Sequence, residues 1–251
     1  MRGFAHRWDR LVPTNGRARH AHLEPGRVVR DLAVRAVAPA VALWAAVTGL
    51  GLLVVGPGDG LPAEEGVSEG LAADRTPFLD SVSHVVSGAA STGVVALVTA
   101  LVVVAVAVRT RRWWFAAVPA LAVLLELGVF LTSAVLVDRE RPEVPQLDEA
   151  PPTSGYPSGH TGASAAVAVV LALLAQRVRP RGLRVAATVV CLLVPFLVGA
   201  ARVYRGMHFP TDVAAGLLNG SGCALLAWGW LRTGTGAADR AATAGDGQTR
   251  A

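Results

Sequence analysis

Residues 113–137 read WWFAAVPALAVLLELGVFLTSAVLV, an apolar run with one ionisable side chain, Glu126. A helix needs about 20 apolar residues to cross the hydrocarbon core of a bilayer. Further runs of this kind occupy residues 32–56, 83–108, 160–177, 183–201 and 212–231. The sequence therefore predicts an all-α fold, an integral membrane bundle of six transmembrane helices.

The composition agrees with a membrane protein. Of 251 residues, 53% are hydrophobic and 16% are charged, whereas about a quarter of the residues are charged in a soluble domain. The pI is near 10.4, and all 23 basic residues are arginines. They lie in short clusters between apolar runs, which favours membrane topology over nucleic-acid binding. The predicted partner is the lipid bilayer, with no nucleic acid, and the oligomeric state stays open.

The polar ends of the chain differ from its apolar middle. Residues 1–31 and 232–251 are polar and rich in Gly and Arg, which predicts flexible tails around a transmembrane domain at 32–231. Residues 1–31 are too long and too polar for a signal-peptide n-region. The acidic segment 57–80 is a weak candidate for an interfacial helix around Phe78 and Leu79. Cys191 and Cys223 fall in apolar runs and are predicted to be buried hydrophobes.

Arginine positions predict the orientation. Arginines gather in 1–31, in the links at 109–112 and 177–184, and in the last 20 residues. Positive charge stays on the cytoplasmic side, so both termini are expected there. The opposite, extracytoplasmic side holds five arginines: Arg75, Arg139, Arg141, Arg202 and Arg205. Four of these flank the polar motifs, which indicates an anion-binding site on the extracytoplasmic face of the membrane.

His208 and Asp212 are four residues apart at the start of the last apolar run. If that helix begins near Thr211, Asp212 lies in its first turn and can accept a hydrogen bond from the imidazole. That bond would leave the other ring nitrogen free as a nucleophile or base. The alternative is that Asp212 only caps the helix.

The sequence Pro157-Ser158-Gly159-His160 precedes the fourth apolar run. Ser158 is a good N-cap, Gly159 allows close backbone approach, and free N–H groups at a helix start bind anions. His160 could protonate a leaving oxygen. The alternative is an ordinary capped helix that carries an exposed histidine.

Three arginines have side chains suited to phosphate: Arg139, Arg141 and Arg202. The alternative for the first two is a stop signal after a helix, or pairing with neighbouring carboxylates. Arg205 is a weaker candidate, because an interfacial arginine can simply meet lipid headgroups.

Taken together, these residues resemble the type 2 phosphatidic acid phosphatase superfamily, which also includes vanadium-dependent haloperoxidases. Its motifs are Lys-x6-Arg-Pro, Pro-Ser-Gly-His and Ser-Arg-x5-His-x3-Asp. The second is complete at 157–160, and the third fits Ala201-Arg202, His208 and Asp212. The first fits Ala134 and Arg141-Pro142. The motifs span 134–212, in the right order and spacing.

The resemblance implies a mechanism without a metal or other cofactor. His208 would attack phosphorus to form a phosphohistidine, Asp212 would orient it, and His160 would protonate the leaving oxygen. The phosphate oxygens would be held by a group of donors: Arg141, Arg202, Ser158 and Gly159.

The chain departs from the family pattern at two positions. Ala134 replaces the lysine that contacts phosphate, and Ala201 replaces the serine. Arg139 lies five residues after Ala134 and is a candidate to supply the missing charge. This hypothesis predicts that Arg139→Ala stops turnover while the protein still folds.

Several other features have structural interpretations. The acidic loop between Asp138 and Glu149 is predicted to be solvated and to cover part of the pocket; a metal site there is the weaker alternative. Glu126 is predicted to make an interhelical hydrogen bond, with a place in an acyl-chain groove as the alternative. Small residues at 87–93 and 214–224 predict close helix packing.

The predicted function is a metal-independent membrane lipid phosphatase acting on a phosphomonoester or pyrophosphate. Candidate substrates are phosphatidic acid, phosphatidylglycerophosphate and a polyprenyl pyrophosphate such as undecaprenyl pyrophosphate. One alternative is a vanadate-dependent haloperoxidase. The other is a non-catalytic lipid-phosphate binding or transport protein, which the loss of lysine at Ala134 would suit.

Overall fold

The computed structural model describes residues 33–56, 60–150 and 152–229. Both predicted tails, 1–31 and 232–251, lie outside these residues. Within the described residues, all regular structure is helical. A π-helical turn, η1 (Ala33–Val37), leads into the first helix. The helices are α3 (Ala38–Val55), α4 (Pro62–Ala73), α5 (Pro77–Gly88), α6 (Thr92–Thr110), α7 (Trp113–Val137), α8 (Gly159–Ala175), α9 (Arg181–Tyr204) and α10 (Pro210–Gly229).

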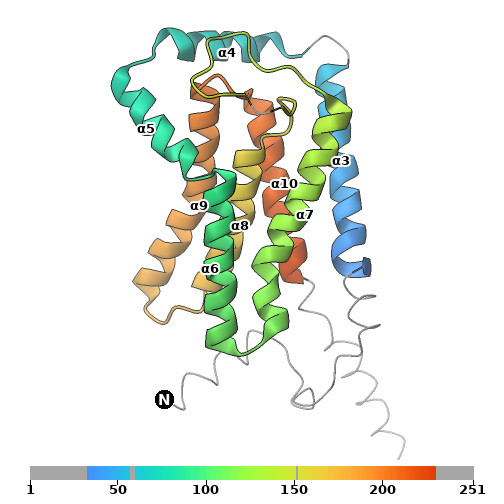
Figure 1. The fold of residues 1–251 in the computed structure, drawn as a ribbon, viewed down its shortest axis with the longest axis vertical. Helices are drawn as coiled ribbons and strands as arrows, with labels where there is room; N and C mark the ends of the chain where they lie inside the picture. Colours follow the sequence, from blue (N-terminus) through green and yellow to red (C-terminus); the bar gives the residue numbers. More distant parts are fainter. Residues whose placement is uncertain (1–32, 57–59, 151, 230–251) are drawn as a thin grey trace, which may run out of the picture.

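Six of these helices run along the long axis of the molecule, and two cover one end (Figure 1). The lengthwise helices are α3 and α6 to α10. Helices α4 and α5 lie at the end where α7 finishes and α8 begins, together with the loop that joins those two helices. Helix α8 packs against α7, α9 and α10. This arrangement brings the starts of α8 and α10 to the same end as α4.

Four helices are long and apolar enough to cross a membrane: α3, α6, residues Phe115–Val137 of α7, and α9. Their exposed surfaces carry large apolar side chains such as Leu101, Val135 and Phe196. Helix α8 is shorter, with 17 residues, and α10 carries Asp212 and Asn219 within it. The protein is therefore a multi-pass membrane protein, while a total of six crossings remains a prediction.

The apolar run at 83–108 does not form one helix, so the expected second span is corrected. Helix α5 ends at Gly88, and α6 begins at Thr92 after a turn. The physical reason is that Ser83 and Ser87 are buried and hydrogen-bonded to arginines of α9 and the turn that follows it. These polar contacts hold α5 against α9, where it slants down the side of the bundle from α4 to α6 (Figure 1). The proposed interfacial residue Phe78 lies on α5 and is largely exposed.

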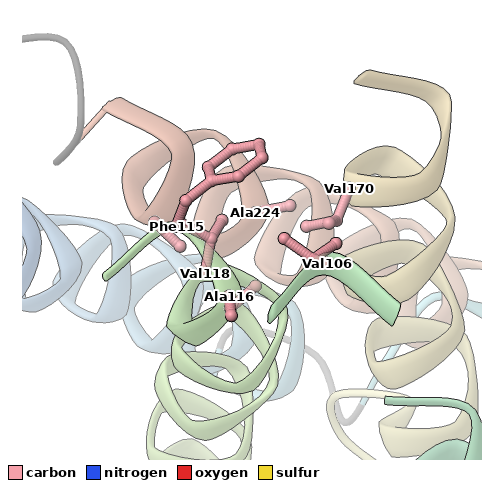
Figure 2. Packing of buried hydrophobic residues seen from close by; sticks show 8 residues of the cluster. Val106, Phe115, Ala116, Val118, Val170 and Ala224 are labelled. Atoms are coloured by element: carbon pink, nitrogen blue, oxygen red, sulfur yellow. The ribbon is translucent and has the colours of Figure 1, made fainter. Parts of the chain in front are cut away.

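The hydrophobic core has one cluster toward the end opposite α4, where α6, α7, α8 and α10 meet (Figure 2). Phe115 is buried there and contacts Trp228 edge-on, with ring centroids 5.7 Å apart. Val106, Val170 and Ala224 pack around it. This apolar packing holds α8 and α10 against the outer helices.

Close helix packing occurs where α8 crosses α10. A side chain at Gly220 would collide with the carbonyl oxygen of Gly162, and one at Gly216 would lie 2.5 Å from the carbonyl oxygen of Ser158. The prediction for 214–224 is therefore confirmed. At Gly88 and Gly93 an added Cβ would meet nothing within 4 Å, so the prediction for 87–93 is wrong there. These two glycines face open space on the outside of the bundle.

Candidate active site

His208 lies in the short turn between α9 and α10, which Gly206 permits by adopting a φ of +72°. The imidazole is buried, and its Nδ1 is 2.7 Å from the carbonyl oxygen of Gly155. Asp212 Oδ2 is 3.9 Å from the same nitrogen, too far for a hydrogen bond. The group that accepts the hydrogen bond of His208 Nδ1 is thus the backbone carbonyl of Gly155, whereas the sequence suggested the carboxylate of Asp212.

This contact decides which imidazole nitrogen is available. A carbonyl oxygen only accepts, so Nδ1 donates its proton and Nε2 keeps its lone pair. Burial lowers the pKa of His208 well below 6.5, and the positive charges of Arg202 and Arg141 lower it further. His160 also lowers this pKa, so both arginines and His160 lie within electrostatic range. A neutral imidazole with a free Nε2 is chemically a nucleophile or base.

Asp212 is in the first turn of α10 and has no exposed surface. Its Oδ2 accepts a hydrogen bond of 2.7 Å from the N–H of Phe209, and its Oδ1 accepts one of 2.6 Å from Arg139 Nη1. The Ser158 N–H donates to the Asp212 carbonyl at 2.9 Å. Asp212 therefore shapes the turn that carries His208 and joins it to the Pro-Ser-Gly-His segment.

Arg139, the predicted substitute for the missing lysine, has both terminal nitrogens engaged by neighbouring side chains. Its Nη1 donates to Asp212 and, at 2.7 Å, to Thr211 Oγ1, and its Nη2 donates to Glu64 Oε2 at 2.9 Å. The guanidinium also lies over the Phe209 ring, 4.2 Å from the centroid. Both terminal nitrogens thus serve buried carboxylates. These contacts form a structural ion pair, and the phosphate contact of Arg139 stays a prediction.

Arg141 holds two segments of the site together. Its Nη1 donates to the carbonyl of Met207 at 2.7 Å, and its Nη2 donates to the carbonyls of Thr153 and Ser154 at 3.1 and 3.3 Å. Its charge is therefore directed at the turn that carries His208. Burial lowers the pKa of Arg141 from its usual value, although a guanidinium remains charged.

Arg202 is almost fully buried near the end of α9. Its Nη1 donates to Asp148 Oδ2 at 2.8 Å and to Ser87 Oγ at 3.0 Å. Its Nε is buried and has no hydrogen-bond partner among the described residues. A buried donor without a partner carries a desolvation cost, and an anion at this position would remove that cost.

Asp148 was expected in a solvated loop and instead pairs with two arginines. Besides Arg202, it accepts from Arg205 Nη2 at 2.6 Å and from Arg205 Nε at 2.8 Å. The hydrogen bonds from Arg205 hold the pKa of Asp148 below its usual value. Arg205 also donates to Ser83 and to the carbonyls of Asp80 and Leu147. It is therefore a scaffold residue that anchors the loop, and it does not meet headgroups.

The start of α8 carries the Pro-Ser-Gly-His segment. Ser158 is fully buried and precedes the first helical residue, and its Oγ lies 2.9 Å from Thr161 Oγ1. A Cβ on Gly159 would lie 2.9 Å from the Phe130 ring, so only glycine fits there. His160 is half-buried in the first turn. The structure thus brings His160, His208, Arg141 and Arg202 to one end of the bundle.

Glu64 is the residue that sequence reasoning missed. It lies on α4 and is buried, and its carboxylate accepts from Arg139 and Thr211. The only signal in the sequence was the acidic character of 57–80, which does not single out one position. Tertiary contact with α10 makes Glu64 part of the site.

Glu126 confirms the predicted interhelical contact. It is buried in α7, and Asn219 of α10 donates to its Oε1 at 3.3 Å and to its carbonyl at 3.2 Å. This pair braces α7 against α10, beside Gly162 of α8.

Among the described residues, no group of three or more His, Cys, Asp or Glu side chains is arranged to hold a metal ion.

Comparison with known proteins places this geometry in a family. The PAP2 superfamily model matches residues 116–235. The chain has the fold of a transmembrane PAP2-type phosphatidylglycerolphosphate phosphatase from Bacillus subtilis, with a TM-score of 0.66 and 19% identity over 78% of this chain and 96% of that one. It also resembles LpxE from Aquifex aeolicus, with a TM-score of 0.55 and 21% identity over 67% of this chain and 96% of that one. No curated sequence matches. The matched segment includes all three motifs, and the chain therefore shares the sequence pattern of the PAP2 superfamily and the fold of its membrane phosphatases.

Proposed function

We propose that this protein is a membrane phosphatase that hydrolyses the phosphomonoester or pyrophosphate of a lipid through a phosphohistidine. One observation carries the proposal: the buried imidazole of His208, whose Nδ1 is fixed by Gly155 and whose Nε2 is free. The surrounding positive charges favour its neutral form. The match of residues 116–235 to the PAP2 superfamily model supports the same chemistry.

In the first step, Nε2 of His208 forms a bond to phosphorus while the bond to the leaving oxygen breaks. His160, which the negative charge of the bound phosphate group would keep protonated, donates its proton to that oxygen, so the leaving group departs as an alcohol, or as a phosphate when the substrate is a pyrophosphate. The phosphorylated ring then carries positive charge. The Gly155 carbonyl accepts its Nδ1–H, and the carboxylate of Asp212 lies 3.9 Å away. Both stabilise that charge.

In the second step, water attacks phosphorus and Nε2 leaves. His160, now neutral, accepts the proton of the water, and inorganic phosphate is released. This sequence returns both histidines to their starting states.

Donors for the phosphate oxygens surround His208. Arg202 offers the buried Nε that has no partner in the described part of the chain, and Arg141 directs positive charge at the same turn. The N–H groups at the start of α8, which include that of Gly159, complete the proposed anion site together with the hydroxyl of Ser158. Arg139 is left out of this set, because its terminal nitrogens are engaged by carboxylates.

A lipid substrate is supported by the location of the site. The motif residues lie at one end of helices that are apolar enough to span a membrane, where lipid headgroups would be. The links with clustered arginines, 109–112 and 177–184, lie at the opposite end (Figure 1). This separation supports an extracytoplasmic site. The proposed substrates are phosphatidic acid, phosphatidylglycerophosphate and polyprenyl pyrophosphates.

The test is phosphate release from a panel of these lipids, in detergent with a metal chelator present. Wild type is compared with His208→Ala and with His84→Ala, a matched change at an exposed histidine. We expect wild type and His84→Ala to release phosphate and His208→Ala to release none above background. Equal release from wild type and His208→Ala would exclude the mechanism.

A further inference from the structure

Glu64 is a charged residue buried outside the three motifs. It lies in the first turn of α4, a helix that crosses the end of the bundle, and is only 6% exposed (Figure 1). Its neighbour Glu69 on the same helix is exposed. A carboxylate is buried at a high cost in free energy unless its oxygens are paired. The contacts that offset this cost show what Glu64 does.

Both oxygens of Glu64 bind groups next to the catalytic histidine. Oε1 accepts from the backbone N–H of Thr211 at 2.7 Å. Oε2 accepts from Thr211 Oγ1 at 3.0 Å and from Arg139 Nη2 at 2.9 Å. Thr211 lies between His208 and Asp212, at the start of α10. Glu64 therefore binds the first turn of α10 from a different helix.

The same contacts form a chain that ends at Asp212. Glu64 holds Arg139 through Nη2, and Arg139 holds Asp212 Oδ1 through Nη1 at 2.6 Å. The other oxygen of Asp212 accepts the Phe209 N–H, next to His208. One guanidinium thus lies between two buried carboxylates. The hydrogen bonds from Arg139 to Glu64 and Asp212 join ionised groups, and such bonds are stronger than those between neutral groups.

We propose that Glu64 is a positioning residue for the phosphatase reaction. By binding Thr211 and Arg139, it fixes the turn from His208 to Asp212, and so holds the imidazole in its attacking orientation. The proposal rests on the proposed function. Among the described residues, the hydrogen bonds and ion pairs of Glu64 go to Arg139 and Thr211 and none goes to Arg141 or Arg202, so we expect it to act on turnover and not on phosphate binding.

The experiment compares Glu64→Gln with Glu69→Gln in the full chain, purified in detergent. The same charge is removed from the same helix, at a buried and at an exposed position. Turnover and KM are measured on a lipid phosphate that wild type hydrolyses, and inhibition by orthovanadate serves as a probe of the phosphate site. Thermal unfolding of each variant is recorded in parallel.

We expect kcat of Glu64→Gln to fall by about tenfold to hundredfold, as for the loss of a buried charged hydrogen bond. Its KM and orthovanadate inhibition should stay within about twofold of wild type, because the phosphate-binding groups are unchanged. Glu69→Gln should match wild type. If Glu64→Gln does not fold, Glu64→Asp is tested in its place, because aspartate keeps the carboxylate charge on a shorter side chain. It should show a smaller fall in kcat at unchanged KM.

Wild-type kcat in a folded Glu64→Gln or Glu64→Asp would overturn the proposal. A higher KM and weaker orthovanadate inhibition at unchanged kcat would also overturn it, because they would show that Glu64 acts on phosphate binding. Failure of the proposed function gives a different result: wild type itself would release no phosphate.

Discussion

At the scale of single residues, three buried charges meet beside the candidate nucleophile. Asp212 and Glu64 contribute carboxyl groups, and the guanidinium of Arg139 lies between them and bonds to both. Removal of one partner from such a group leaves the others buried without compensation. The side chains near His208 therefore contribute to stability as well as to chemistry.

Arg139→Ala should consequently destabilise the protein, because it leaves two buried carboxylates unpaired. The expected loss is about 3–5 kcal/mol in the free energy of unfolding. Denaturation in detergent measures it, with Arg181→Ala at an exposed position as the control. Normal stability combined with weaker phosphate binding would contradict the ion-pair role and restore the lysine-like one.

The pH profile depends on His208, which must be neutral to attack. Because its pKa is lowered well below 6.5, the neutral form persists as the pH falls through 6.5. The acid limb of kcat/KM should therefore lie below pH 6.5, after titration of the substrate phosphate is accounted for.

Arg202→Gln provides the check on that profile. The positive charge of Arg202 lowers the pKa of His208. The Arg202→Gln variant should therefore show its acid limb of kcat/KM at higher pH than wild type, even if its overall rate is lower. An acid limb that stays in place would show that another group controls it.

At the scale of elements, the site depends on how closely α8 approaches α10. Both helices begin in motif residues, and glycines at their crossing let the backbones meet. The Ser158 N–H bonds to the Asp212 carbonyl at the top of this crossing. A change in helix separation would therefore move the two motifs apart.

Gly220→Ala tests this packing. Its Cβ would collide with the Gly162 carbonyl and lie 2.9 Å from the Cβ of Ala165, so we expect a loss of about 1–3 kcal/mol in stability and lower turnover. Gly93→Ala is the matched control, because its Cβ meets nothing within 4 Å. Equal thermal stability of the two variants in detergent would contradict the close crossing.

At the scale of the whole molecule, charge and chemistry are separated along the bundle axis. The motif residues and α4 lie at one end, and the arginine-rich links lie at the other (Figure 1). The positive-inside rule predicts that the arginine-rich end faces the cytoplasm. The proposed substrate would then meet the site from the outer leaflet.

Cysteine labelling of intact cells tests this orientation. Gly66 on α4 and Gly182 at the start of α9 are exposed, and both have open space for a side chain. In a background with Cys191 and Cys223 replaced by alanine, a membrane-impermeant maleimide should label Gly66→Cys. It should label Gly182→Cys only after the membrane is permeabilised. The reverse pattern would invert the topology.

The sequence alone determined the helical class, the apolar runs and the motif positions, because these depend on local composition and fixed spacing. His160 and His208 could be singled out because their motifs are short and continuous. Most span boundaries followed as well, and the exception was the run at 83–108. There the apolar character continues while contacts of Ser83 and Ser87 with α9 and the turn after it redirect the chain.

Only the tertiary structure decided the hydrogen-bond and ion-pair partners of the site residues. The acceptor for His208 is the carbonyl of Gly155, a backbone atom 53 positions away that no side-chain pattern can indicate. Arg139 turned from a phosphate ligand into a partner of Glu64 and Asp212 because α4 folds across the end of the bundle. The physical reason is that a buried charge must be paired with whatever the fold brings near it, and contacts between distant segments are set by packing rather than by spacing.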